Sequence, residues 1–174
     1  MQTTVIKTFI MITLMVISTL LFGETSYGSY KKNNAQLPIK DFIYHWNESK
    51  KVLTIIQTPS LLSDTERSDL KAGKNEFMVL FKKETPNEER WQWYPYIVTE
   101  ITFKTNEIKP STIKSFYIAS YGVEKKNHTD NFNSVPSSTN LFNKIGIKDG
   151  KLSISYSGES KMMDDSHSWS MNIQ

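Results

Sequence analysis

Aromatic side chains crowd around an arginine in the segment RWQWYPY, residues 90–96. If this segment is a strand, successive side chains point to opposite faces, so Trp91 and Trp93 share one face while Tyr94 and Tyr96 share the other. One face belongs to the core, and the other exposes a pair of rings unless it too is covered, as in a central strand. Exposed rings bury a large area with few rotatable bonds, which is typical of a contact surface for a protein or a sugar ring.

A second candidate contact region is the polar stretch 122–140, which contains His128 and Asp130. A loop of this length is uncommon inside a compact domain unless it has a function or is disordered. We therefore count these two residues, together with the aromatic segment, as candidate binding residues. The predicted binding set is Arg90, Trp91, Trp93, Tyr94, Tyr96, His128 and Asp130.

Three histidines, at positions 45, 128 and 167, are the other groups whose chemistry is relevant. His167, Asp165 and one of many serines would supply the residue types of a hydrolase triad, but no Gly-x-Ser-x-Gly motif accompanies them. Zinc needs three or four converging ligands, and neither His128 with Asp130 nor Asp164 and Asp165 with His167 predicts such a set. The sequence thus predicts no catalytic residue, no metal site and no cofactor.

The charge pattern argues against nucleic acid as a partner. The 174 residues carry a net charge of +3, and the basic residues are scattered instead of clustered. Arginine, which binds phosphate with two parallel hydrogen bonds, occurs only at positions 67 and 90. The chain has no cysteine, which excludes disulfides, thiolate nucleophiles and zinc–sulfur sites.

The first 28 residues have the pattern of a secretory signal peptide. Lys7 precedes an uncharged apolar run, Phe9 to Phe22, and the small residues Ser26 and Gly28 follow it. This order predicts cleavage before Ser29, with no stable membrane anchor afterwards, and a secreted or periplasmic protein. An uncleaved anchor is the alternative, but a span needs about 20 apolar residues and this run is shorter. Asn47 and Asn127 begin glycosylation sequons, which matter only in a host that attaches glycans.

The remainder of the chain alternates between polar and apolar residues in the manner of strands. After a flexible leader at 29–40, we expect about eight strands in one domain, 41–174, including 76–83, 90–96, 97–104 and 113–121. The single expected helix begins with a capping box at Ser63–Glu66 and ends near Gly73, and Asp149-Gly150 predicts a tight hairpin turn. Short connections favour antiparallel pairing. The predicted fold is an all-β antiparallel sandwich, or alternatively a closed barrel, with one short helix.

These features favour an exported non-catalytic binding protein. Its partner would be a protein, such as a hydrolase or toxin to be inhibited, or a glycan. One alternative is a secreted hydrolase of cell-wall or extracellular polymers with His128 or His167 as the base, and another is a surface-assembly component.

Overall fold

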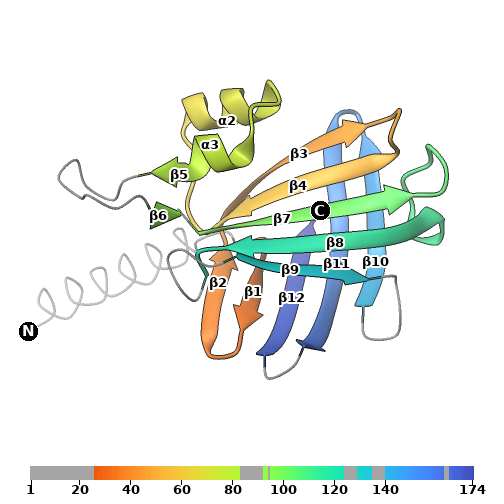
Figure 1. The fold of residues 1–174 in the computed structure, drawn as a ribbon. Helices are drawn as coiled ribbons and strands as arrows, with labels where there is room; N and C mark the ends of the chain where they lie inside the picture. Colours follow the sequence, from red (N-terminus) through yellow and green to blue (C-terminus); the bar gives the residue numbers. More distant parts are fainter. Residues whose placement is uncertain (1–25, 83–91, 94, 124–128, 135–139, 163–164) are drawn as a thin grey trace, which may run out of the picture.

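Two open antiparallel sheets packed face to face form the body of the protein in a computed structural model. The structure describes residues 26–82, 92–93, 95–123, 129–134, 140–162 and 165–174. The strands of one sheet cross those of the other at a steep angle (Figure 1). The expected antiparallel sandwich is therefore confirmed, and the sheets do not close into a barrel.

Each sheet has five strands, and every pairing is antiparallel. The order in the first sheet is β10 (Asn140–Lys148), β11 (Lys151–Met162), β12 (Asp165–Ile173), β1 (Gly28–Lys32) and β2 (Ala35–Ile39). The order in the second is β3 (Asp41–Asn47), β4 (Val52–Thr58), β7 (Tyr96–Phe103), β8 (Ile113–Tyr121) and β9 (Thr129–Ser134). A 3-10 turn at Pro110–Thr112 precedes β8.

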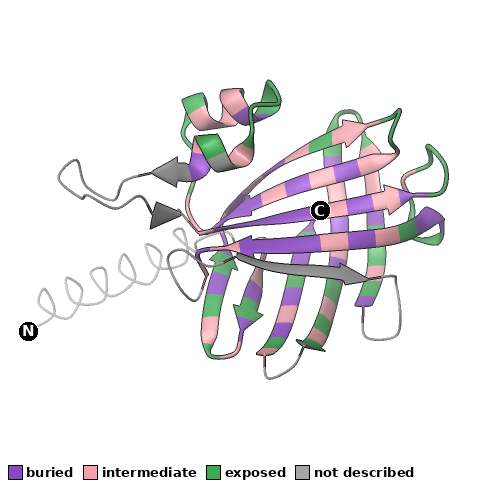
Figure 2. Cartoon of the chain, viewed as in Figure 1, coloured by how far each residue is buried: buried purple, intermediate pink, exposed green. Residues whose placement is uncertain are grey.

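The main core lies between the two sheets and follows from the alternation of side chains along each strand. Leu53, Ile55, Ile101 and Ile154 are fully buried there, and the banding of buried and exposed positions is visible along the strands in Figure 2. A second, smaller cluster lies on the outer face of the second sheet, beneath the helices. Its buried members are Ile43, Leu62, Leu70, Leu80, Tyr96 and Val98.

The expected helix is present as α2 (Asp64–Lys71), and its start is fixed by the capping box. The Ser63 backbone N–H donates to Glu66 Oε2 at 2.7 Å, and the Glu66 N–H donates to Ser63 Oγ at 3.3 Å. Gly73 follows the helix with a φ of +78°, which is a conformation that glycine adopts without strain. This part of the sequence analysis is confirmed.

The expected strand 76–83 is wrong over most of its length. Residues Glu76–Leu80 form a second short helix, α3, and only β5 (Phe81–Lys82) is extended. The N–H of Met78 donates to the backbone oxygen of Asn75 at 3.0 Å, so the first turn of α3 begins at that asparagine. The apolar run favours a strand by residue type, but the N–H groups of Met78 and Val79 both donate to the Asn75 oxygen and start a helical turn instead.

The flexible leader expected at 29–40 is not what the structure has there. These residues form most of the β1–β2 hairpin, and β1 lies between β2 and β12 within the first sheet. Tyr30 and Leu37 face the core, whereas intervening polar residues conceal the alternation in the sequence. Cleavage before Ser29 stays a prediction, and it would remove Gly28, the first residue of β1.

Two further segments differ from their expected form. The strand expected at 90–96 is divided: β6 (Gln92–Trp93) pairs with β5 in a separate two-stranded sheet, and β7 begins at Tyr96. The stretch 122–140, expected to be a loop, contains β9, which pairs with β8 at the edge of the second sheet. A proline at position 95 separates β6 from β7, and a strand edge supplies backbone partners even to the polar sequence of β9.

Candidate functional site

Among the predicted binding residues, only Tyr96 has a described side chain. Trp93 lies in β6 and Asp130 in β9, but their side chains, like Arg90, Trp91, Tyr94 and His128 as a whole, lie outside the described part of the chain. Tyr96 is fully buried in the smaller cluster, so its ring itself is not an exposed contact. Its surroundings are the starting point for locating the site.

The ring of Tyr96 stacks against the ring of Tyr121. Their centroids are 4.3 Å apart and their planes differ by 8°, because Tyr96 at the start of β7 is paired with Tyr121 at the end of β8. Tyr121 is partly exposed and covers the buried ring. The hydroxyl of Tyr96 is buried and has no hydrogen-bond partner within the described residues.

The same outer face carries Tyr117 four residues before Tyr121 on β8, and Glu100 directly opposite Tyr117 on β7. Glu76, the first residue of α3, is near enough for its charge to act on Tyr117. Burial is the largest cause raising the pKa of Tyr117, and the negative charges of Glu100 and Glu76 raise that pKa further. We call the five residues Glu76, Tyr96, Glu100, Tyr117 and Tyr121 the tyrosine–glutamate patch.

The electrostatics link the carboxylates of the patch to its tyrosines. The charge of Glu76 contributes to raising the pKa of all three tyrosines, and that of Glu100 contributes at Tyr117 and Tyr121. In each case desolvation by burial is the largest cause. The phenols therefore stay neutral at ordinary pH, and the two carboxylates supply the charge of the surface.

No basic side chain neutralises these carboxylates in the described part of the chain. On β7, Glu100 has Thr54 of β4 on one side and Tyr117 of β8 on the other. In the helical segment, Lys74 Nζ lies 2.7 Å from Asp69 and Arg67 pairs with Asp41, so these cations are directed to other acids. The ion pairs of the described residues include neither Glu76 nor Glu100.

The sequence analysis missed four of the five patch residues. Tyr117 and Tyr121 fall on the polar face of a strand that was expected, but their proximity to Glu100 depends on the register of β7 and β8. Glu76 was expected in a strand and lies in α3 instead. A tyrosine pair four residues apart on the outward face of an expected strand was the available signal.

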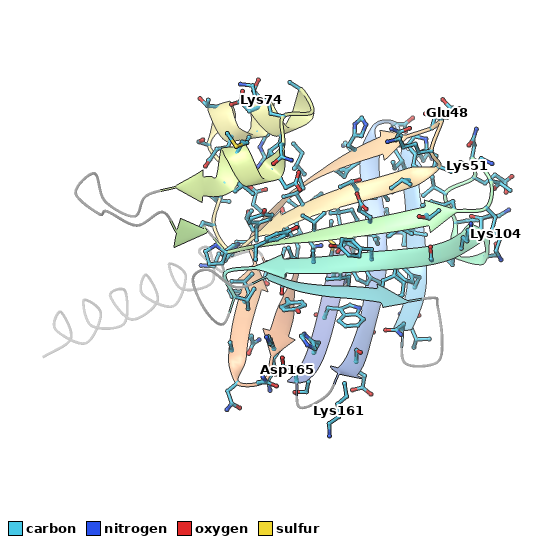
Figure 3. All side chains as sticks on the ribbon, viewed as in Figure 1. Glu48, Lys51, Lys74, Lys104, Lys161 and Asp165 are labelled. Carbon is cyan, nitrogen blue, oxygen red and sulfur yellow. The ribbon has the colours of Figure 1, made fainter. Side chains whose placement is uncertain are left out.

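A separate polar network lies inside the sandwich, around His167 of β12. Ser120 Oγ donates to the Tyr30 hydroxyl at 3.1 Å, and that hydroxyl lies 2.9 Å from His167 Nδ1. The buried ammonium of Lys32 lies 3.2 Å from Asp165 Oδ2, and Asp165 is labelled in Figure 3. The described residues contain no cluster of three or more metal-ligating side chains.

The outward face of β11 and β12 has a different character. Small uncharged polar side chains line its central part, between Lys151 at one end of β11 and Glu159 and Lys161 at the other. A hollow of about 300 Å³ lies where β11 and β12 meet the segment before β1. The polar side chains around the hollow are Ser26, Asn143, Ser155, Ser157, Ser170 and Asn172.

Comparison with known families, known proteins and solved structures finds no match to this chain. No helix within the described residues has both the length and the apolar character needed to cross a membrane. The functional argument therefore depends on the geometry of the described surfaces.

Proposed function

We propose that this chain is an exported, non-catalytic binding protein, secreted or periplasmic, that holds a protein partner at the tyrosine–glutamate patch. Of the aromatic segment 90–96, Tyr96 is the residue that belongs to this patch. The observation that carries the proposal is the stack of a partly exposed tyrosine, Tyr121, over a buried tyrosine whose hydroxyl lacks a partner within the described residues. A partner bound at the patch would reach this enclosed hydroxyl only if the side chains that cover it moved aside.

The patch also has the physical features of an interface centre. Tyrosine combines a large apolar ring with a polar end, and it loses little conformational entropy when it is immobilised. The rings of Tyr117 and Tyr121 stand on β8, which is paired on both sides within the second sheet. A rigid scaffold of this kind lowers the entropic cost of binding.

Capture from an extract of the protein's own envelope or host tests the proposal. Tyr117→Ala should abolish capture of the partner without unfolding the protein, because Tyr117 is partly exposed. His45→Ala is the matched control, since His45 is exposed on β3, three strands away from β8 in the same sheet. Equal capture by the wild type and Tyr117→Ala, with unchanged circular dichroism, would refute the patch as the binding surface.

A glycan is the second candidate partner, favoured by the hollow on β11 and β12. Cleavage before Ser29 would remove Ser26 from its rim. The serine hydroxyls and asparagine amides that remain on β10, β11 and β12 can both donate and accept hydrogen bonds without charge, which suits the hydroxyl groups of a neutral sugar. Titration with chitotetraose should then shift the side-chain amide resonances of Asn143 and Asn172 but not those of Asn47. Unshifted Asn143 and Asn172 resonances would eliminate this candidate for that sugar.

Export has its own test, because it depends on the apolar run Phe9 to Phe22. Intact-mass measurement of the protein recovered outside the cytoplasm should show loss of that run. A full-length product retained in the membrane would show that the segment is an anchor.

A further inference from the structure

We propose that the tyrosine–glutamate patch recognises a cationic side chain, an arginine or lysine, on the surface of a basic protein partner. This inference rests on the proposed binding function and names the chemistry of the group that is bound. Two carboxylates, Glu76 and Glu100, share one aromatic surface and have no ion-pair partner in the described part of the chain. A cation would compensate both of them.

The second, independent observation is the hydroxyl of Tyr96. This side chain is fully buried, and its oxygen has no hydrogen-bond partner among the described residues. Burying an unpaired polar group costs free energy, so native proteins rarely leave one without a bonding role. The hydroxyl lies within the electrostatic influence of Glu76. Its lone pairs can accept a hydrogen bond from a guanidinium or an ammonium group once the side chains that cover it, with Tyr121 stacked on the ring, move aside.

The aromatic rings favour an organic cation over a metal ion. A cation is attracted to the face of a tyrosine ring, and arginine combines this contact with hydrogen bonds to a carboxylate. A hard metal ion instead requires several oxygen ligands around it, and the described residues contain no group of three or more ligating side chains. The combination of two carboxylates with three tyrosines therefore matches a guanidinium or ammonium group.

The accessibility of the patch favours a side chain presented by a protein surface. Glu76 on α3 is partly exposed, as are Glu100, Tyr117 and Tyr121 on the outer face of the second sheet. Arginine is enriched at the centres of protein interfaces together with tyrosine, where surrounding contacts exclude water. A basic protein would thus place one such side chain between Glu76 and Glu100.

Fluorescein-labelled octa-arginine and octa-lysine are the probes, with octa-glutamine as the neutral control, in fluorescence anisotropy at 20 mM and 150 mM salt. The wild type should bind the cationic peptides and not octa-glutamine, and higher salt should weaken binding because screening reduces the attraction. The double variant Glu76→Gln with Glu100→Gln should bind about tenfold more weakly, since it loses two carboxylate contacts at the aromatic surface. Tyr96→Phe should weaken binding by about twofold to fivefold, the effect of one hydrogen-bond acceptor.

The matched control is Glu48→Gln with Glu107→Gln, which removes the same charge elsewhere. Glu48 lies in the β3–β4 turn, at the end of the second sheet far from the helices (Figure 3), and Glu107 is exposed and paired with Lys109. This control should change peptide affinity by less than about twofold. Absent binding of both cationic peptides by the wild type, or an equal loss in the two double variants, would overturn the inference.

Two further outcomes separate this inference from the proposed function. If capture of the natural partner depends on Tyr117 but not on Glu76 and Glu100, the patch remains the binding surface, and the inference that it binds a cationic side chain is wrong. If Tyr117→Ala still captures its partner, the proposed function fails whatever the peptides do. A dimer in sedimentation velocity that disappears in the Glu76, Glu100 double variant would identify a second copy of this chain as the occupant, and would overturn the heterologous partner.

Discussion

The main core between the sheets and the smaller cluster beneath the helices treat their buried tyrosines differently. Three tyrosines are buried within the described residues: Tyr30, Tyr96 and Tyr156. In the main core, the Tyr156 hydroxyl lies 3.1 Å from Thr99 Oγ1, and Tyr30 lies 2.9 Å from His167 Nδ1. In the smaller cluster, the hydroxyl of Tyr96 has no such partner in the described part of the chain.

This difference distinguishes the smaller cluster, for which we propose a binding role, from the paired tyrosines of the main core. A paired hydroxyl inside the sandwich contributes to a unique packing, whereas an unpaired one costs free energy in the free protein. The smaller cluster also carries two carboxylates that lack an ion pair among the described residues, on a surface of aromatic rings. The unpaired hydroxyl and the two carboxylates lower the stability of the free protein at the place where we propose that binding occurs.

Truncation of buried side chains should have the largest effect and should distinguish the two regions. Phe116 is buried in the main core, with edge-on contacts to Phe142 and Trp169, so Phe116→Ala should destabilise the protein by about 3–5 kcal/mol. Leu80→Ala in the smaller cluster should cost about 2–4 kcal/mol because leucine loses less buried volume than phenylalanine when it is truncated to alanine. Urea unfolding measures the free energy of unfolding of both variants. A larger loss of stability for Leu80→Ala than for Phe116→Ala would contradict this ranking of the two regions.

Added volume should reveal how tightly the main core is packed. A Cβ at Gly158 would lie 2.4 Å from Asn140 Oδ1 and 2.7 Å from the ring of Trp169, so Gly158→Ala should cost about 1–3 kcal/mol. Gly146→Ala is the control, because its Cβ would meet only the Ile108 oxygen at 3.8 Å. The control should be neutral or slightly stabilising in thermal unfolding. Equal melting temperatures for the two variants would show that the packing at Gly158 relaxes freely.

Removal of the two contrasting hydroxyls should have effects of opposite sign. Tyr156→Phe deprives Thr99 of a partner in a buried network and should destabilise the protein by about 1–2 kcal/mol. Tyr96→Phe removes a hydroxyl that has no partner in the described residues, so it should leave stability unchanged or raise it by up to about 1 kcal/mol. Chemical denaturation of both variants decides the matter. A marked loss in Tyr96→Phe would mean that its hydroxyl is bonded in solution.

Alkaline pH provides a further test of Tyr96. The pKa of Tyr96 is raised first by burial, then by repulsion from the Tyr121 phenol when that group ionises, and then by the charge of Glu76, so the folded protein keeps the phenolic proton where the unfolded chain loses it. The unfolded state binds fewer protons above about pH 10, and stability therefore falls as pH rises, by up to about 1.4 kcal/mol per pH unit for this group. Urea midpoints between pH 9 and 11 should fall less steeply in Tyr96→Phe than in the wild type. Parallel slopes would contradict the assignment.

Sequence patterns between neighbouring residues predicted most of the fold. The features that they did not predict depend on pairing between segments far apart in the sequence. The capping box at Ser63–Glu66 was recognisable because its two hydrogen bonds join residues three apart. The patch was not, because the approach of Glu100 to Tyr117 follows from strand register and that of Glu76 from the helix α3. Likewise, β9 forms from a polar sequence because the edge of β8 is available for pairing. Residue type alone carries neither kind of information.

The smallest expected effect is that of substitutions in the β10–β11 turn. They test backbone strain alone, without changing the packing of the main core or of the smaller cluster. The β10–β11 hairpin turns through Asp149 and Gly150 at φ values of +51° and +70°, so the predicted tight turn is confirmed. No atom lies within 4 Å of a Cβ built on Gly150, and Gly150→Val should therefore cost about 1 kcal/mol through its conformation alone. Gly150→Asn should cost less, because asparagine tolerates positive φ better than other side chains. Thermal unfolding should rank glycine above asparagine and asparagine above valine; a neutral valine would show that the turn can rearrange without disturbing either region.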